Sequence, residues 1–242
     1  MSGVFLAITG GLLLWDLEHP ERFYMIFTRP QWRSWLVKGA FIIAGYSLVL
    51  ALHFLASLMS YKTAQSWLMV AGIPLSVLTA IYTAYLFAQA KARDMWQNPL
   101  LPPHLLVQTL LLGSAVLLLV HSWSEGIGDT GTNVGSPAAL SHLLWILAIT
   151  SLLHVLMVWG EVSLTHPTAH ARLAVWEMIS GRYKSDFWIG MVLSMLGGVM
   201  PWLALSGVIS GPMGVSGAPL ALIGLMLFEN AYVQAGQSVP LA

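Results

Sequence analysis

Acidic side chains are scarce in this sequence, and several stand at the end of apolar segments or inside them. Asp16 follows an apolar run at the start of DLEHPERF, Glu161 ends the run SLLHVLMVWGE, and Glu229 lies within LALIGLMLFENAYVQ. A carboxylate at membrane depth costs about 2.5–3.5 kcal/mol on insertion scales, so it usually faces a bundle interior or a water-filled cavity. These acids are therefore candidates for proton transfer, although Asp16 could equally end a helix and pair with Arg22.

A second set of polar residues follows one stripe of a predicted helix. Tyr82, Tyr85, Gln89 and Trp96 fall near this stripe, and Asp94 lies at its membrane end. Phenols, an amide and a carboxylate along one face can hydrogen-bond a quinone carbonyl and accept a quinol proton. Tyrosine and tryptophan also form interfacial belts in many membrane proteins. Tyr82 lies several residues inside the span, which favours the functional interpretation.

The histidines raise a rival hypothesis, because a b-type haem needs two imidazoles that face each other across helices. His53, His121 and His142 are expected toward one end of the bundle, and His104 and His154 toward the other. No two predicted helices carry matched pairs of histidines. A lone histidine in a membrane often serves as a hydrogen-bonding group between helices, so haem is the less favoured hypothesis.

Composition defines the class of protein that must position these residues. The chain has 242 residues, of which 57% are hydrophobic, and it contains 11 tryptophans and no cysteine. Such a composition indicates a polytopic membrane protein. The zero formal net charge gives no global basic field for nucleic acid. Without cysteine, the chain cannot hold a disulfide, a thiolate nucleophile or an iron–sulfur cluster of its own.

Apolar windows predict an all-α transmembrane bundle, because about 20 apolar residues are needed to cross a bilayer as a helix. Residues 2–15 are equally apolar but too short, and we expect them to be the second half of a helix. A segment at 166–183 is predicted to be an amphipathic helix lying in the membrane interface. We expect one domain over 1–242. The six full spans are expected near 36–60, 65–90, 103–124, 138–160, 187–209 and 215–234.

Basic residues are distributed unevenly among the loops between these spans. Alternate loops lie on opposite sides of the membrane, and one side collects nine Lys and Arg residues while the other collects one. The positive-inside rule places the rich side, with the C-terminus, in the cytoplasm.

Three segments resemble the NrfD/PsrC-like membrane subunits of polysulfide reductase, related molybdoenzymes and alternative complex III. DLEHPERF is similar to the family's D-L-x-x-P-x-R-F, YTAYLFAQAKARDMWQNPLLPPH to its Y-T-G and W-x-x-P region, and ENAYVQAGQSVPLA to its closing segment. The chain departs from the pattern at Glu18, where glycine is usual, and at Asp94, where proline is common. Family members commonly have eight or more helices, so about one and a half helices at the N-terminal side are expected to be missing here.

The resemblance implies a subunit that binds menaquinone or ubiquinone near the terminal cluster of a ferredoxin-like iron–sulfur partner, with no haem or cluster of its own. A molybdopterin-type or cytochrome-bearing catalytic subunit is the further expected partner, and the bacterial cytoplasmic membrane the expected location. The predicted quinone-binding residues are Asp16, Arg22, Tyr82, Tyr85, Gln89, Asp94 and His104. The predicted proton path comprises Glu161, Glu229, His154 and Glu125.

The favoured function is therefore a quinone-binding membrane subunit, not catalytic alone, that exchanges electrons with an iron–sulfur partner and takes up or releases protons. The alternatives are a haem b anchor, a proton-translocating subunit without its own quinone site, and a purely structural anchor. Several relatives dock their iron–sulfur partner on the outer face, whereas the positive-inside rule puts DLEHPERF in the cytoplasm. Either the quinone site lies at the other end of the bundle or the partner is cytoplasmic.

Overall fold

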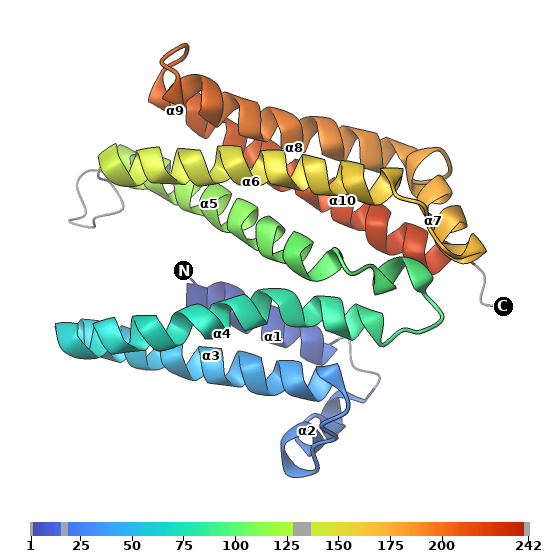
Figure 1. The fold of residues 1–242 in the computed structure, drawn as a ribbon. Helices are drawn as coiled ribbons and strands as arrows, with labels where there is room; N and C mark the ends of the chain where they lie inside the picture. Colours follow the sequence, from blue (N-terminus) through green and yellow to red (C-terminus); the bar gives the residue numbers. More distant parts are fainter. Residues whose placement is uncertain (1, 16–18, 128–136, 240–242) are drawn as a thin grey trace. The chain divides into compact units, whose positions relative to one another are not determined.

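The computed structural model describes residues 2–15, 19–127 and 137–239, and every regular element within these ranges is helical. Six helices in them are long and apolar enough to cross a membrane, and a short apolar helix precedes them. The predicted all-α bundle with six spans and an N-terminal short helix is thereby confirmed (Figure 1). The chain divides into two compact units, residues 1–90 and 91–242.

The first unit is built around a helical hairpin whose two arms are joined by a short connection. Gly39 lies directly beneath the ring of Tyr82, and the rings of Trp35 and Tyr85 stack with their centroids 4.4 Å apart. These contacts hold α3 against α4 at the end where the hairpin opens. The elements of this unit are α1 (Ser2–Trp15), η1 (Pro20–Arg22), α2 (Met25–Thr28), α3 (Trp35–Leu58) and α4 (Lys62–Ala88).

The second unit is a four-helix bundle with three short additions. Helix α6 packs between α5 and α8, and α10 packs against both α5 and α8, so the four long helices enclose a common interior (Figure 1). The short helix α7 packs against α8 and α10 at one end of the bundle. The elements are η2 (Asp94–Gln97), α5 (Leu101–Ile127), α6 (Pro137–Ser163), α7 (Ala169–Ile179), α8 (Lys184–Leu205), α9 (Gly211–Val215) and α10 (Gly217–Ser238).

Small residues bring α8 and α10 into close backbone contact. A Cβ on Gly197 would stand 2.7 Å from the backbone nitrogen of Ala221, and a Cβ on Gly190 would stand 2.8 Å from the carbonyl oxygen of Gly224. Helices in membranes associate through such small residues, because lipid offers no hydrophobic drive for packing. This contact fixes how α10 presents its other faces to the bundle interior.

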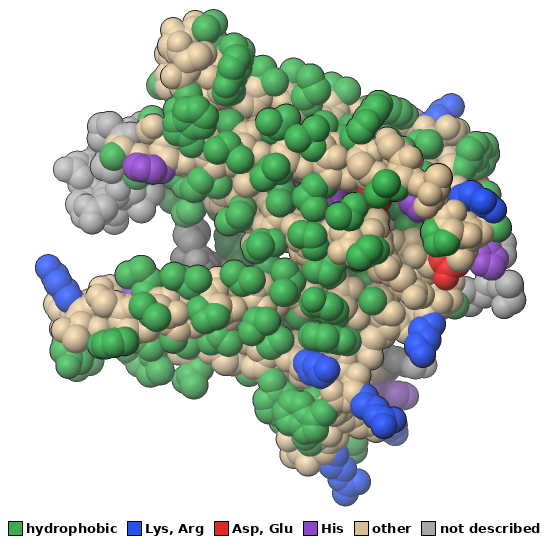
Figure 2. All heavy atoms as spheres, viewed as in Figure 1, with side chains coloured by type: hydrophobic (Ala, Val, Ile, Leu, Met, Phe, Trp, Pro, Cys, Tyr) green, Lys and Arg blue, Asp and Glu red, His purple; other side chains and the backbone are tan. Residues whose placement is uncertain are grey.

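The second unit has apolar side chains outside and polar side chains inside. Trp188, Val192 and Met195 on α8 are each more than half exposed. Figure 2 shows hydrophobic side chains over the visible faces of the long helices and Lys and Arg side chains of this unit near α7. Buried positions include His154, Glu161 and other polar residues. Polar groups that face a bundle interior are the usual arrangement for functional groups in membrane proteins.

Helix α7 occupies most of the segment for which an amphipathic helix is predicted. The Thr168 hydroxyl accepts a hydrogen bond from the backbone N–H of Ala171 at 3.2 Å and caps its N-terminus. One face is buried against the unit through Ala174 and Met178, while Trp176 on the opposite face is exposed. Its location in the membrane interface remains a prediction.

Candidate functional site

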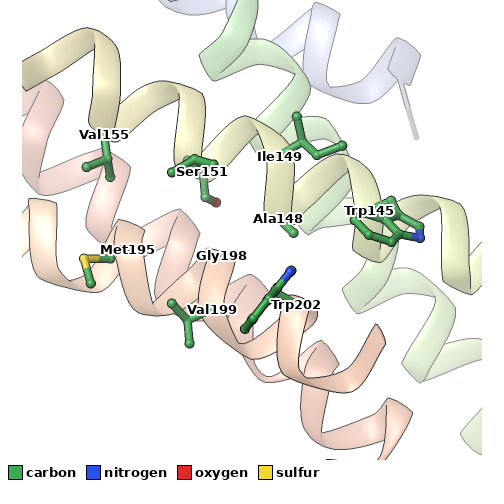
Figure 3. A pocket seen from close by; sticks show the side chains of 10 residues that line it. Trp145, Ala148, Ile149, Ser151, Val155, Met195, Gly198, Val199 and Trp202 are labelled. Carbon is green, nitrogen blue, oxygen red and sulfur yellow. The ribbon is translucent and has the colours of Figure 1, made fainter. Parts of the chain in front are cut away.

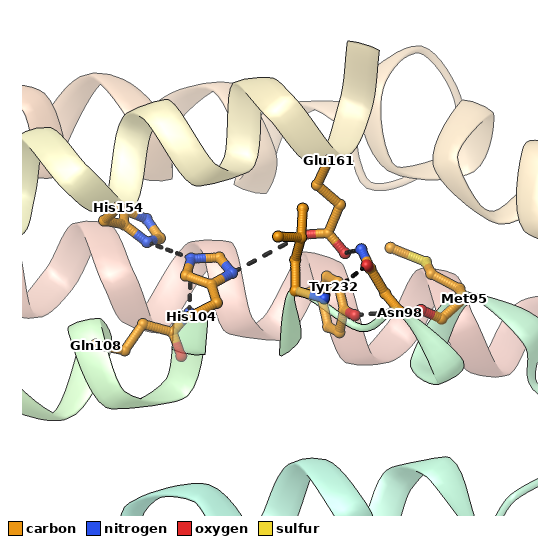
Figure 4. Close-up of polar contacts among 8 residues, drawn as sticks. Met95, Asn98, His104, Gln108, His154, Glu161 and Tyr232 are labelled. Carbon is orange, nitrogen blue, oxygen red and sulfur yellow. Dashed lines mark hydrogen bonds and ion pairs between the residues drawn. The ribbon is translucent and has the colours of Figure 1, made fainter. Parts of the chain in front are cut away.

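A line of hydrogen-bonding side chains crosses the interior of the second unit. The amide Nδ2 of Asn98 donates to the Glu161 carboxylate at 2.8 Å. The other carboxylate oxygen stands 3.8 Å from Nδ1 of His104, which is ion-pair range but longer than a hydrogen bond. Nε2 of His104 and Nδ1 of His154 share a hydrogen bond at 2.9 Å. We call these four residues the His–Glu chain (Figure 4).

Helical periodicity places two members of this chain on one helix face. Glu161 follows His154 by seven residues on α6, which is about two turns, so both side chains project to the same side. His104 lies in the first turn of α5. Asn98 lies just before that helix, and its side-chain oxygen accepts from the backbone N–H of Leu100 at 3.0 Å. The turn before α5 therefore orients the amide toward Glu161.

These side chains are almost completely withdrawn from the surface. His154 is 0% exposed, His104 1% and Glu161 4%. The ring of Phe228 on α10 covers both imidazoles, with centroid distances of 4.9 Å to His154 and 5.7 Å to His104. A buried polar group is costly unless it is hydrogen-bonded, so the contacts between these residues are what allow them to lie here.

Glu229 lies beside this chain. Its carboxyl hydrogen-bonds with the side chain of Gln108, and the Gln108 amide stands 3.5 Å from Nε2 of His104. Tyr232, one turn further along α10, contacts the Glu161 carboxyl and directs its hydroxyl to the carbonyl oxygen of Met95 at 3.4 Å. Of the predicted proton path, Glu161, Glu229 and His154 thus lie in one cluster, and His104, which we assigned to quinone binding, lies among them.

Asp94, another predicted residue of the second unit, lies at the edge of the bundle. It begins η2, and its carboxylate is 4.0 Å from Nδ1 of His170 on α7. Next to it, the Arg93 guanidinium donates to the carbonyl oxygen of Val239 at 2.6 Å, which ties η2 to the end of α10. Cations commonly satisfy the last carbonyls of a helix in this way.

Tyr82 and Tyr85 lie in the first unit beside small pockets. A pocket of about 240 Å³ is lined by Trp35, Leu78, Tyr82, Tyr85 and neighbouring apolar residues. Tyr82 also borders a second pocket of about 140 Å³ between α1, α2 and α3. Tyr82 is buried, whereas Tyr85 is 38% exposed. Both tyrosines therefore line the same pocket, and their role in quinone binding remains a prediction.

Gln89 hydrogen-bonds to the backbone of the first unit, and its predicted role in quinone binding remains a prediction. Its Oε1 accepts from the backbone N–H of Trp35 at 2.8 Å, and its Nε2 donates to the carbonyl oxygen of Arg33 at 3.2 Å. The side chain therefore caps the start of α3, whose first N–H groups have no partner within the helix.

Three further predicted residues are only partly open to description. Arg22 ends η1 and is exposed. Asp16, its expected ion-pair partner, lies outside the described residues, and so does the side chain of Glu125 within α5. The contributions of these residues remain predictions.

Asn98, Gln108 and Tyr232 were not predicted from the sequence, although the spacing of two of them carries a signal. Gln108 follows His104 by four residues and Tyr232 follows Glu229 by three, and such spacings place side chains on one helix face. Asn98 lies in a turn, where no periodicity applies.

The arrangement can pass a proton along alternating donors and acceptors. An imidazole can accept at one ring nitrogen while it donates from the other, and His104 has Glu161 on one side and His154 on the other. Among the described residues, no group of three or more His, Asp and Glu side chains could hold a metal ion. The arrangement therefore has the donor and acceptor groups that proton transfer would need.

Comparison with known proteins places the chain in a family. A sequence profile described as polysulphide reductase, NrfD, matches residues 1–239. A putative membrane subunit of dimethyl sulfoxide reductase from Halobacterium salinarum is 26% identical over 226 residues, covering 83% of this chain and 50% of that protein. A selenate reductase subunit from Mesobacillus selenatarsenatis is 26% identical over 231 residues, covering 78% of this chain and 53% of that protein.

The chain thus spans about half the length of these curated relatives. Because the profile matches nearly the whole chain and six helices can span a membrane, this multi-pass membrane protein belongs to the polysulphide reductase NrfD family.

Proposed function

We propose that this chain is the quinone-binding membrane subunit of a multisubunit oxidoreductase. It exchanges electrons between the quinone pool and an iron–sulfur partner subunit, and its own residues take up or release the accompanying protons. The observation that carries the proposal is the His–Glu chain, an acid and two imidazoles in contact inside an apolar bundle. Ionisable groups at such depth usually mark proton or substrate pathways.

The pocket of about 240 Å³ lined by Trp35, Tyr82 and Tyr85, which we call the aromatic pocket, is the proposed site for a quinone headgroup. The rings of Trp35 and Tyr85, which stack on each other, line this pocket together with Tyr82. Its volume of about 240 Å³ is below the usual range of about 300–1,000 Å³ for whole ligands. The pocket therefore suits the ring, with the isoprenoid tail in lipid. A bound quinone would supply the two-electron, two-proton chemistry, while these residues orient its ring and hydrogen-bond its oxygens.

The partners follow from the relatives and from the composition. Both relatives are named as parts of reductases, one for dimethyl sulfoxide and one for selenate. This chain has no cysteine with which to hold a cluster. The electron partner is therefore an iron–sulfur subunit, and a molybdopterin-type or cytochrome-bearing subunit performs the final reaction. The charge distribution of the loops favours a cytoplasmic C-terminus, and the family resemblance favours the bacterial cytoplasmic membrane as the location.

The first prediction tests Glu161 as the acid of the relay. Glu161→Gln keeps the side-chain shape but cannot carry a proton, and general acid–base groups contribute about 10²–10⁴-fold to rates. We expect quinol-dependent turnover of the assembled complex to fall at least about tenfold, with the complex and its quinone content intact. Turnover is measured on purified complex with a soluble quinol, and quinone content by extraction and chromatography.

Glu177→Gln is the matched control. Glu177 lies on α7, where its carboxylate accepts from the backbone N–H of Arg182 at 3.1 Å, outside the His–Glu chain. The same chemical change there should leave turnover within about twofold, as exposed and peripheral substitutions usually do. If Glu161→Gln behaves like Glu177→Gln, the relay has no part in turnover.

A second candidate function is proton translocation without a quinone site in this chain. It is favoured by the location of the His–Glu chain, which lies wholly within the second unit and needs no residue of the aromatic pocket. The two functions differ in quinone content, because a pure translocator would be purified without stoichiometric quinone.

The geometry of the His104–His154 pair does not favour the haem hypothesis at this position. His104 and His154 approach with their nitrogens 2.9 Å apart, whereas two ligands on opposite sides of an iron, at bonds of about 2 Å each, stand about 4 Å apart. The rings would have to separate before they could hold an iron between them.

A further inference from the structure

Three buried side-chain atoms on α6 and α8 have no hydrogen-bond partner among the described residues. They are Nε2 of His154, Oγ of Ser151 and Oγ of Ser194. The three side chains are 0% to 1% exposed. A buried polar group without a partner costs about 1–3 kcal/mol, and native proteins satisfy such groups with protein atoms or with ordered water. Three such groups in one interior require an explanation.

The three side chains line the same stretch of the α6–α8–α10 interior. His154 packs against Phe228 of α10 at 4.9 Å. Ser194 on α8 faces Gly224 of α10, where an added Cβ would stand 2.7 Å from the Ser194 hydroxyl. Gly224 precedes Phe228 by four residues, so both lie on the same face of α10 about one turn apart. Ser194 and His154 therefore contact positions of α10 that lie about one turn apart.

Ser151 occupies the neighbouring position on α6. It precedes His154 by three residues, on the same helix face. An added Cβ on Gly198 of α8 would stand 3.2 Å from its hydroxyl, and Gly198 follows Ser194 by four residues. Figure 3 shows Ser151 opposite Gly198 across the seam between α6 and α8.

The groove on the outer side of the α6–α8 seam is mostly apolar, so its described residues offer these three groups few hydrogen-bond partners. A groove of about 390 Å³ between α6 and α8 is lined by Ser151 and by apolar and tryptophan side chains (Figure 3). Two hydrogen bonds of about 2.8 Å in series span about 5–6 Å, which matches groups one helical turn apart at about 5.4 Å. A water with two to four polar partners is the usual occupant of a polar interior site.

We propose that Ser151, Ser194 and Nε2 of His154 hold internal water between α6, α8 and α10, and that this water extends the proton path of the His–Glu chain toward the middle of the bundle. The proposal rests on the proposed function for its proton-carrying part. The proposal that water is bound there rests only on the geometry of the three atoms that have no hydrogen-bond partner.

The proton transfers along this path balance. Glu161 gives a proton to Nδ1 of His104, Nε2 of His104 gives one to Nδ1 of His154, and Nε2 of His154 gives one to the water. Each imidazole gains a proton at Nδ1 and loses one from Nε2, so its charge is unchanged but its tautomer is inverted until the ring rotates or a proton returns. Glu161 is left as a carboxylate and the water as a hydronium ion until each exchanges a proton with the next group along the path. The serine hydroxyls both donate and accept, so they can orient the water in either direction of transfer.

The direct test is a cryo-EM map of the assembled complex at a resolution that shows water. We expect density within about 2.7–3.2 Å of both the Ser194 hydroxyl and Nε2 of His154, and its loss in Ser194→Ala. A dry interface in which the Ser194 hydroxyl instead donates to the carbonyl oxygen of Gly190 on its own helix would overturn the hydration site.

The functional test uses the double variant Ser151→Ala with Ser194→Ala in the same complex. We expect quinol-dependent turnover to fall about five- to tenfold, with an increased solvent isotope effect in D₂O and unchanged quinone content. Ser114→Ala is the control, because Ser114 is buried in the same unit but already donates to the carbonyl oxygen of Leu111 at 3.0 Å. It should stay within about twofold of the unmodified complex.

The outcomes separate this proposal from the proposed function. Unchanged turnover in the double variant, together with a loss in Glu161→Gln, overturns the water path and leaves the relay in place. Unchanged turnover in Glu161→Gln overturns the relay itself, and the density at Ser194 then decides the hydration site independently.

Discussion

Hydrogen bonds already made within the protein limit what each polar side chain can offer to a ligand. Gln89 uses its amide oxygen and its amide nitrogen on the backbone at the start of α3, so it cannot contact a quinone without leaving that end of the helix unsatisfied. Tyr82 and Tyr85 border the aromatic pocket instead. We therefore expect the proposed quinone site to involve the two tyrosines rather than Gln89.

Removal of the Tyr82 hydroxyl tests whether that pocket binds the quinone ring. A neutral hydrogen bond contributes about 0.5–1.5 kcal/mol, so we expect Tyr82→Phe to raise the quinol KM about two- to tenfold with little change in thermal stability. Steady-state kinetics of the complex with a soluble quinol measure the effect. Tyr46→Phe is the control, because Tyr46 lies on α3 and borders neither of the two pockets that Tyr82 lines. Equal KM values for both variants would place the quinone elsewhere.

Part of the candidate site could be predicted because ionisable residues stand out within apolar segments. Glu161, Glu229 and His154 stand out in the sequence because charge and imidazole are rare among apolar residues, and the structure does bring them together. The contact between His104 and His154 was not predicted, because it depends on the rotation of α5 against α6. Asn98 was missed because its orientation comes from a turn and not from a repeating pattern.

At the scale of whole elements, the spans were predictable and their packing was not. A continuous apolar window needs only its own length to indicate a membrane helix, and all six predicted windows overlap helices of suitable length. Which helix faces which depends on small residues such as Gly197 and Gly224. Glycine carries no hydrophobic signal of its own, so the α8–α10 contact was not visible in the apolar pattern.

The close contact between α8 and α10 predicts that one added methyl group lowers the stability of the protein. In Gly197→Ala the new Cβ would stand 2.7 Å from the backbone of Ala221, so the helices must separate. Overpacking of this kind costs about 1–3 kcal/mol. We expect a lower unfolding midpoint in detergent by denaturant titration followed by circular dichroism.

Gly113→Ala provides the comparison for this variant. Gly113 lies within α5, and no atom stands within 4 Å of its added Cβ. Alanine there should be neutral or stabilising, since alanine favours helix by about 0.8–1.0 kcal/mol relative to glycine. If both variants unfold at the same midpoint, the close contact between α8 and α10 does not limit stability.

At the scale of the whole molecule, the charge of the loops predicts one orientation in the membrane. Nine of the ten Lys and Arg residues belong to loops on one side when six spans alternate across the bilayer. Translocation of Lys and Arg is disfavoured, so that side is expected to be cytoplasmic. The end of the His–Glu chain at Asn98 and η2 belongs to the same side, so in this predicted orientation we expect its protons to exchange with the cytoplasm.

The absence of cysteine makes this orientation directly measurable. The single variants Lys91→Cys and Arg182→Cys each place one thiol at an exposed position on the basic side. These thiols should resist a membrane-impermeant maleimide in intact cells and react after permeabilisation. Cysteines at Lys62 and Ser210, exposed on the other side, should react in intact cells, and the unmodified chain has no thiol that could contribute background. The reverse pattern would place the chain's basic loops outside and would connect the relay to the external medium, where an outward-facing iron–sulfur partner would then be required.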